Sequence, residues 1–270
     1  MLRAMADIGR LWRAARTLAR HDALLPKEFK DRMPPSLKFA RWIFGGGGKA
    51  HEEGTPGIRL ANALESLGPA YIKLGQVLAT RPDVVGTEVA NALASLQDRL
   101  PPFPMSVAKA AVAEALNAPL ESAFSSFSEP IAAASIAQVH KAETTDDPPR
   151  SVAVKVLRPG IAEEFMADIS AFAFAARFAE RFSKEARRLR VTTVVETLAT
   201  STALELDLRM EAAAASELAE RTRNDLDFRV PVVDWNRTHE RVLTTEWIEG
   251  TPIRDVAVLE AAGHDPKKLA

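Results

Sequence analysis

A short β-branched segment with one lysine at its centre constrains this chain more than any other feature. Residues 151–157 read Ser-Val-Ala-Val-Lys-Val-Leu, which is the composition of a half-buried strand interrupted by Lys155. An ammonium group enters such a strand at high cost unless an anion meets it. An acidic helical segment follows at residues 205–211. The sequence therefore predicts a sheet in which Lys155 is held by a helix carboxylate, whereas a lysine on an exposed edge strand is the alternative.

The acidic segment offers three carboxylates, which are Glu205, Asp207 and Glu211. On a continuous helix, Asp207 and Glu211 share a face, while Glu205 lies about 200° from Asp207. Lys155 cannot reach all three, so at least one acid needs another partner. A solvated acidic face is the other interpretation. The leucines and the methionine that alternate with the acids favour partial burial instead.

A tight loop of small residues precedes the lysine strand. Ala132, Ala133, Ala134 and Ser135 separate two segments, 129–133 and 136–143, that read as the arms of a hairpin. Glycine in such a loop lets backbone N–H groups approach a phosphate, whereas alanine methyl groups restrict positive φ and hold the backbone back. Nucleotide binding at this loop should therefore differ from that of a glycine-rich loop.

Composition excludes several classes of function. A net charge of −1 and a pI near 6.6 give no global attraction to nucleic acid. Cysteine is absent, which excludes disulfides and thiolate metal sites and fits a reducing compartment. The five histidines have no ligand spacing, so we expect no structural zinc. No apolar run reaches the roughly 18 residues of a membrane span.

The first twenty residues form a basic amphipathic pattern, with five arginines against one acid, Asp7. At about 100° per residue, one face collects Ile8, Leu11, Trp12, Ala15 and Leu18. This pattern is typical of a helix lying on an anionic membrane surface. A helix docked on the protein itself, with solvated arginines, is the alternative.

Four segments follow from the distribution of glycine, proline and apolar residues. They are a basic N-terminal segment with a glycine-rich linker (1–50), a helical extension (51–125), a sheet-containing lobe (126–254) and a short terminal segment (255–270). Expected helices cover residues 60–78, with a bend at Gly68-Pro69, then 88–97, 105–116, 161–189 and 191–223. Strands at 230–234 and 241–247 follow the lysine strand. The fold class is α+β: a five-stranded antiparallel sheet with helices to one side.

Several motifs occur in order along the chain: Leu67–Gln76 with a K-x-G-Q pattern, Arg81–Asp83, Leu96–Asp98, Pro130–His140, Val152–Gly160 and Glu205–Asp207. In this combination the chain resembles the UbiB/AarF (ABC1-type) family of atypical protein-kinase-like proteins, over about residues 58–254. The resemblance implies that the 126–254 lobe is the N-lobe of a protein-kinase-like fold. It also implies ATP and Mg²⁺ as cofactors and a role in ubiquinone (coenzyme Q) biosynthesis.

The resemblance implies roles for individual residues. The nucleotide site would comprise Ala132, Ala133, Ala134, Ser135, Val139, Lys155 and the hinge residues Glu246, Trp247 and Ile248. Lys155 would contact the phosphates and pair with a helix acid, Glu211 above all. Lys73 and Gln76, which without the family read as solvated side chains, would lie across the site, and Lys73 would meet Glu205 and Asp207.

One departure concerns catalysis. The chain holds no H-x-D-x-x-x-x-N loop and no D-F-G; Asp227-Phe228-Arg229 does not replace it. We therefore expect that the C-lobe is absent, that no catalytic residue or metal ligand lies in this chain, and that the Mg²⁺ ligands belong to the missing lobe. The chain would then be a truncated form or half of a longer gene.

Two functions remain open. One is the N-terminal part of a kinase or ATPase that supports ubiquinone biosynthesis. The other is a non-catalytic module that binds nucleotide, lipid or protein. Expected partners are ATP, an anionic membrane surface or quinone-pathway lipid, and quinone-biosynthesis proteins, with no nucleic acid. The expected location is cytoplasmic, with peripheral attachment to the inner membrane left open.

Overall fold

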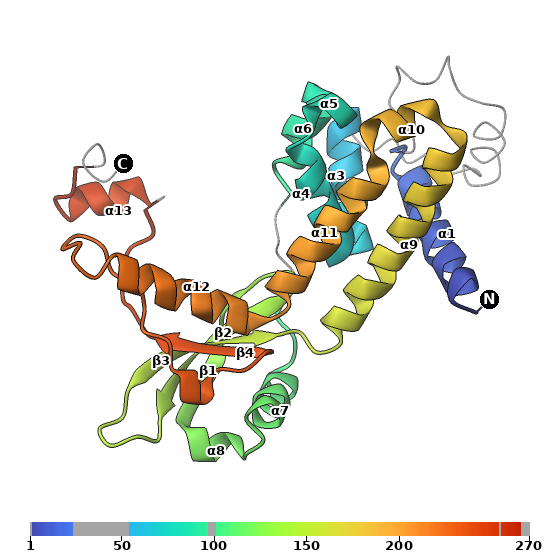
Figure 1. Cartoon of the computed structure of the whole chain (residues 1–270). Coiled ribbons are helices and arrows are strands. Elements are labelled where there is room, and N and C mark those ends of the chain that lie inside the picture. The colour runs from blue at the N-terminus through green and yellow to red at the C-terminus, as the bar shows by residue number, and fades with distance from the viewer. Residues whose placement is uncertain (1, 24–53, 97–100, 254, 266–270) are drawn as a thin grey trace.

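The computed structural model describes residues 2–23, 54–96, 101–253 and 255–265. Its elements form two groups, a helical body and a sheet-containing lobe (Figure 1). The helical body consists of α1 (Leu2–Arg20), α3 (Pro56–Leu67), α4 (Pro69–Ala79), α5 (Pro82–Val85), α6 (Thr87–Leu93), α9 (Ile161–Phe182), α10 (Lys184–Leu189) and α11 (Val191–Glu205). The lobe consists of α7 (Met105–Leu116), α8 (Leu120–Ala123), β1 (Phe124–Ala133), β2 (Ala137–Thr144), β3 (Ser151–Leu157), α12 (Leu208–Arg221), the 3₁₀ turn η2 (Trp235–Arg237) and β4 (Val242–Glu246), followed by α13 (Val256–Ala261).

The sheet has four antiparallel strands in the order β1-β2-β3-β4, so the prediction of five strands is wrong. The segment expected as the fifth strand, 230–234, pairs with β4 only through a bridge between Val233 and Thr245. Pro231 lacks an amide donor. The Asp234 amide still donates to the Thr244 carbonyl of β4 at 2.9 Å, but its side chain already caps η2 by accepting a hydrogen bond from the Asn236 amide. Regular pairing therefore does not extend along this segment.

Helices cover both faces of the sheet, which corrects the expectation that they lie to one side. Val152, Val154 and Val156 point to one face and share a buried cluster with residues of α7 and α8. The alternate residues of β3 point to the opposite face, where Leu157 packs in a cluster with Leu208 of α12. In Figure 1 the sheet accordingly lies between α12 and the α7–α8 pair.

The helical extension is broken where the sequence predicts a bend. Gly68, with φ of +104°, ends α3, and Pro69 begins α4. Gly75 on α4 allows a close approach, because a Cβ there would lie 2.3 Å from Leu96 and 2.9 Å from Leu64. The helix expected at 88–97 ends at Leu93, and residues 97 and 98 of the Leu96–Asp98 motif lie outside the described residues.

The expected helix 191–223 is two helices, α11 and α12, separated at Leu206-Asp207. Asp207 adopts extended backbone geometry and caps α12, its side chain accepting a hydrogen bond from the Arg209 amide. Asp207 therefore lies before the helix that carries Glu211, and the three acids are not on one continuous helix. A similar cap at Ser183 separates α9 from α10.

The helix α1 is docked on the protein itself, which is the alternative named above. Arg10 donates to Asp168 of α9 at 2.7 Å, and Ala14 enters the core of the helical body. The expected apolar face is only partly covered, since Ile8 and Trp12 remain 54% and 49% exposed. A buried carboxylate on α9 explains why a charged residue of α1 faces inward. The glycine-rich linker, Gly45–Gly48, lies outside the described residues.

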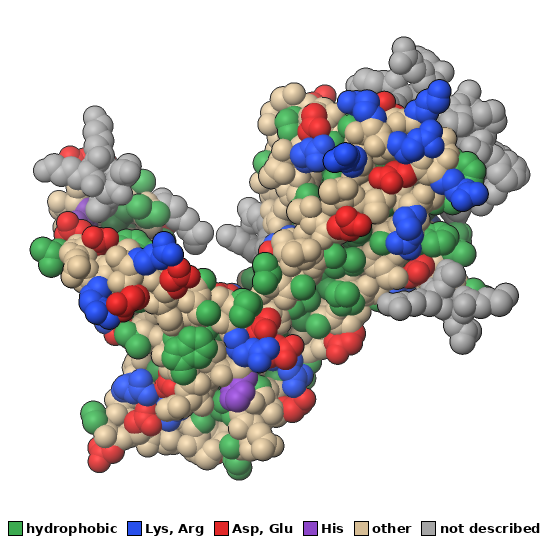
Figure 2. Space-filling model, in the orientation of Figure 1, with side chains coloured by type: hydrophobic (Ala, Val, Ile, Leu, Met, Phe, Trp, Pro, Cys, Tyr) green, Lys and Arg blue, Asp and Glu red, His purple; other side chains and the backbone are tan. Residues whose placement is uncertain are grey.

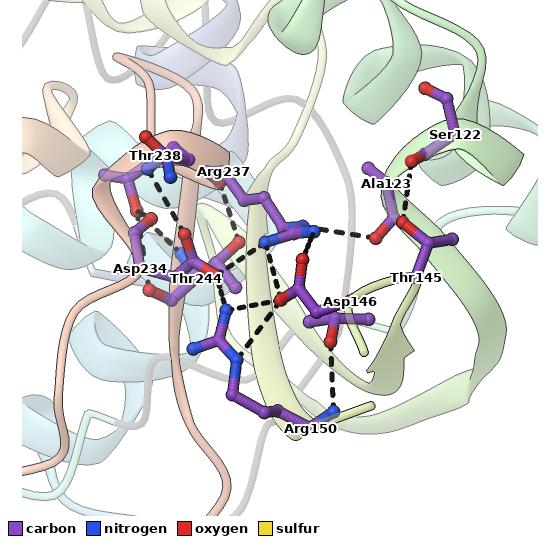
Figure 3. Close-up of polar contacts among 11 residues, drawn as sticks. Ser122, Ala123, Thr145, Asp146, Arg150, Asp234, Arg237, Thr238 and Thr244 are labelled. Atoms are coloured by element: carbon purple, nitrogen blue, oxygen red, sulfur yellow. Dashed lines mark hydrogen bonds and ion pairs between the residues drawn. The ribbon is translucent and has the colours of Figure 1, made fainter. Parts of the chain in front are cut away.

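A network of two aspartates and two arginines closes one end of the sheet (Figure 3). Arg237 of η2 donates to Asp146 at 2.8 Å and to Asp234 at 2.9 Å, and Arg150 bonds the same two acids. These residues join the β2–β3 turn to the turn before β4.

Within the described ranges, no helix is both long enough and apolar enough to cross a membrane.

Candidate functional site

The candidate site is built on one row of residues across the sheet. Ala132, Val139, Lys155 and Leu243 are successive partners on β1, β2, β3 and β4. Directly opposed residues of antiparallel strands share a face, so Lys155 lies in a strip of small and apolar side chains. Leu243 was missed from the sequence, because its membership depends on the β3–β4 register.

Lys155 makes a two-pronged contact with the helix above this face. Its Nζ donates to Glu211 Oε1 at 2.9 Å and to Oε2 at 2.7 Å. The side chain is 30% exposed, so the ammonium is held in place yet remains accessible from solvent. The geometry is that of a cation positioned by a carboxylate with one side left open.

The start of α12 is fixed to the sheet by two kinds of contact. Leu208 and Ala212 are buried in a cluster with Leu157 and Leu243. The Leu208 amide donates to the Glu240 carbonyl at 2.8 Å, just before β4. Glu211 lies between these two buried positions, and the packing therefore sets its height above Lys155.

The alanine loop is shorter than the four residues named for it. Ala132 and Ala133 end β1, and the turn is closed by the Ala134 amide, which donates to the Ala137 carbonyl at 2.8 Å. Ser135 is buried within the turn. None of these four has a positive φ, and three residues elsewhere are the described non-glycine residues that do. Alanine methyl groups are thus accommodated without left-handed backbone.

Of the three hinge residues named from the sequence, Glu246 ends β4 and the other two follow it. The Glu246 amide donates to the Val232 carbonyl at 2.8 Å, and the Trp247 amide to the Ser151 carbonyl at 3.1 Å. Within the part of the chain that the structure describes, the Ile248 amide has no backbone partner. Lys141 lies over the Trp247 ring, 4.8 Å from its centroid.

A second lysine–glutamate pair lies outside this strip. Lys73 of α4 contacts Glu205 Oε2 at 2.7 Å, at the end of α11. Asp207, which was expected to share Lys73, instead bonds Arg209 at 2.9 and 2.7 Å, and this guanidinium lowers the pKa of the Asp207 carboxyl. Gln76, one turn along α4, is half-buried, and its side chain forms no hydrogen bond with a described residue.

A buried histidine supports the same sheet from the opposite face. His140 on β2 contacts the Ser128 carbonyl through Nδ1 at 2.8 Å, so that nitrogen carries the proton. Its Nε2 then accepts from the Gln138 amide at 2.9 Å, and Gln138 also bonds the backbone of Phe103. Desolvation lowers the pKa of His140 below its ordinary value. This network was not anticipated from the sequence.

The described residues contain no group of three or more histidines, cysteines or carboxylates able to hold a metal ion. Comparison with known proteins then decides the family. The profile of the ABC1 atypical kinase-like domain matches residues 95–270. The chain belongs to this family.

Curated relatives of this family member are named as probable protein kinases UbiB. The chain is 41% identical over 215 residues to the one from Marinobacter nauticus, covering 79% of this chain and 39% of the relative. It is 44% identical over 218 residues to the one from Xanthomonas euvesicatoria, with the same coverage. The chain thus spans about two fifths of the length of the curated relatives it matches.

A solved structure is also similar to this chain. The chain is similar to the Mycobacterium tuberculosis protein in the complex of Rv3197 with erythromycin, with a TM-score of 0.52 and 34% identity. The match covers 72% of this chain and 48% of that one. The ABC1 family member described here therefore has a mixed helix-and-sheet, kinase-like fold, as the resemblance implied.

Proposed function

We propose that this chain forms the nucleotide-binding lobe of a UbiB-type atypical kinase or ATPase that acts in ubiquinone biosynthesis. The observation that carries the proposal is the contact of Lys155 with both oxygens of Glu211 on an accessible sheet face. A phosphate group brings oxygens that can replace solvent at the open side of the ammonium. Glu211 then keeps the charged amine aimed at them.

The neighbouring residues fit the rest of a nucleotide. Ala132 and Val139 beside Lys155 offer an apolar platform for a base and ribose, while Leu243 in the same row is buried beneath α12. The Ile248 amide, which has no backbone partner among the described residues, offers one donor to the adenine edge, while Glu246 and Trp247 have their amides engaged. Ala134 would lie near the phosphates with its methyl group in place of an open glycine backbone, while Ser135, buried within the turn, would shape the loop beneath it.

A nucleotide-bound Mg²⁺ is held by the phosphate oxygens together with one or two protein ligands, which in protein kinases are the D-F-G aspartate and the catalytic-loop asparagine. The described residues contain no group of three or more histidines, cysteines or carboxylates that could hold a metal ion. The chain also has no H-x-D-x-x-x-x-N or D-F-G pattern to position a nucleophile. We therefore propose that the 270 residues bind nucleotide without turning it over. This is the binding-module alternative, and phosphoryl transfer would need residues that this chain does not contain.

Titration calorimetry with ATP tests the proposal. The chain should bind ATP, and Lys155→Ala should weaken binding at least about tenfold, since a charge-assisted hydrogen bond to phosphate contributes about 1.5–3 kcal/mol. Lys109→Ala is the matched control, because Lys109 is an exposed lysine on α7, across the sheet. Equal affinities for the two variants would remove Lys155 from the site, and absence of binding by the native chain would end the proposal.

A membrane partner is proposed on separate grounds. Met5, Ile8 and Trp12 form an exposed apolar stripe on α1, one turn apart, beside exposed arginines. Such a stripe suits peripheral contact with an anionic bilayer, where quinone-pathway lipids and their enzymes would be met. Ile8→Ser with Trp12→Ser should reduce flotation with anionic vesicles, whereas Val107→Ser, an exposed apolar change on α7, should not. Equal flotation of both would exclude α1 as the contact.

A further inference from the structure

A cleft of about 330 Å³ lies between the end of α4 and the α10–α11 junction. Arg81, Arg188 and Arg190 line it together with Thr80, Thr193 and Thr197, and an apolar wall completes it. Figure 2 shows lysine and arginine side chains gathered over α10. None of the residues that line the cleft belongs to the row of Lys155 and its strand partners on the sheet, so the nucleotide site does not explain the cleft.

Two of the three arginines are held in fixed orientations by neighbouring carboxylates. Arg81 bonds both oxygens of Asp83 at 2.8 Å, and Arg188 donates twice to Glu185, at 3.0 and 2.6 Å. Arg188 also contributes to lowering the pKa of Asp83, after the larger effect of Arg81, which brings α5 and α10 into one electrostatic neighbourhood. Their charges are therefore largely matched.

The third arginine supplies the unmatched charge. Arg190 forms no ion pair with any residue in the described ranges, and its side chain is exposed at the cleft. Its backbone has a φ of +51°, a left-handed conformation that is uncommon for arginine. That conformation fixes Arg190 at the point where α10 ends and α11 begins. The cleft thus carries a surplus positive charge at the junction of α10 and α11.

The rest of the lining limits the kind of anion. Val77, Leu189 and Val194 give the cleft an apolar wall. A guanidinium matches the paired oxygens of phosphate or carboxylate, and apolar walls with a few polar groups are typical of small-molecule sites. We propose that this cleft binds an anionic amphiphile, with a phosphate or carboxylate head at Arg188 and Arg190 and a short apolar chain along the wall.

The site would join the same two helices that the Lys73–Glu205 pair joins. Val77 belongs to the end of α4 and Arg81 to the turn that follows it, while Thr193 and Val194 belong to the start of α11. Lys73 meets Glu205 at the opposite end of α11. A ligand in the cleft would therefore stabilise the packing of α4 against α11. Binding should raise the melting temperature of the whole chain, as any ligand selective for the folded state does.

Calorimetry with hexyl phosphate tests the site. The native chain should bind hexyl phosphate. It should bind hexanol, which lacks the anionic head, and inorganic phosphate, which lacks the apolar chain, at least about tenfold more weakly. Arg190→Gln should weaken the binding of hexyl phosphate about tenfold. The variant should still fold, because Arg190 has no ion pair within the described ranges and its replacement leaves no described carboxylate unpaired. Arg221→Gln on α12, where Arg221 pairs with Glu217 in solvent, is the matched control.

Three results would overturn the proposal. The native chain fails to bind hexyl phosphate, the two variants Arg190→Gln and Arg221→Gln lose the same affinity for it, or inorganic phosphate binds as tightly as hexyl phosphate. Competition by vesicles containing phosphatidic acid would identify a phospholipid head as the source of the anion, and lack of competition a free organophosphate. ATP titration of Arg190→Gln should be unchanged, which distinguishes failure here from failure of the nucleotide site.

Discussion

At the scale of single residues, the three carboxylates of the acidic segment 205–211 have different partners, and two of them form lysine–glutamate pairs. Lys155 takes Glu211 and Lys73 takes Glu205, while Asp207 caps α12 and bonds Arg209. The sequence predicted both lysines and the need for more than one partner. The family resemblance named Glu211 for Lys155 and Glu205 for Lys73, and these are the pairs observed. Asp207 was expected to share Lys73 and bonds Arg209 instead, because the periodicity gave no sign that the helix breaks at Asp207.

The Lys73–Glu205 pair should contribute only modestly to stability. Both side chains retain solvent contact, and pairs of this kind contribute about 0.5–1 kcal/mol. A double-mutant cycle of Lys73→Ala and Glu205→Ala, measured by urea unfolding, should give a coupling in that range. A cycle of Arg209→Ala with Glu205→Ala is the control and should show none. Zero coupling between Lys73 and Glu205 would show that the contact has no energetic role.

His140 should make stability depend on pH. Because burial lowers its pKa in the folded state, the unfolded chain binds the extra proton more readily as the pH falls below about 6.5. The stability that the neutral ring contributes is present above that pH and is lost as the pH falls towards the folded-state pKa. Protonation of His140 Nε2 would also turn it into a donor that faces the N–H donor of the Gln138 side-chain amide. Unfolding free energies of native chain and His140→Gln should therefore converge on acidification, and parallel curves would contradict this.

At the scale of elements, the sequence was most informative where local signals were strong. The helix α7 has the bounds expected for it, and the alanine turn separates β1 from β2 as predicted. The expected apolar face of α1 was wrong in part, because its partner α9 presents Asp168 and selects Arg10. Long-range partners of this kind leave no periodic mark in the sequence.

The glycine of the K-x-G-Q pattern should be required for packing. A Cβ at Gly75 would lie within 3 Å of both Leu64 and Leu96, which are buried. Gly75→Val should cost about 2 kcal/mol through overpacking of this interface. Gly9→Val on α1 is the matched control, because nothing lies within 4 Å of a Cβ there. The comparison uses urea midpoints, and similar midpoints for the two variants would mean that α3, α4 and residue 96 are not closely packed.

At the scale of the whole molecule, one end of the sheet depends on residues far apart in sequence. The four-residue network in Figure 3 joins the β2–β3 turn to η2, and Asp234 within it is only 5% exposed. The family and its kinase-like lobe could be predicted from ordered motifs. The strand count could not, since the pairing of residues 230–234 depends on where Asp234 turns to meet Arg237.

Arg237 should be the more important arginine of that network. Both arginines bond both acids, but Arg237 is largely buried whereas Arg150 is half exposed. Arg237→Ala should destabilise the fold by about 2 kcal/mol, because Asp234 loses a buried partner. Arg150→Ala should cost clearly less in the same thermal unfolding experiment. The reverse order would show that the solvent-facing half of the network holds the turns together.

The central claim is that Lys155 meets the phosphates of a bound nucleotide. It is tested most directly by labelling lysines with an amine-reactive reagent, with and without saturating ATP, and quantifying each modified peptide by mass spectrometry. Lys155 should be protected by ATP, while Lys109 should label equally in both samples. ATP that binds but leaves the labelling of Lys155 unchanged would contradict the account.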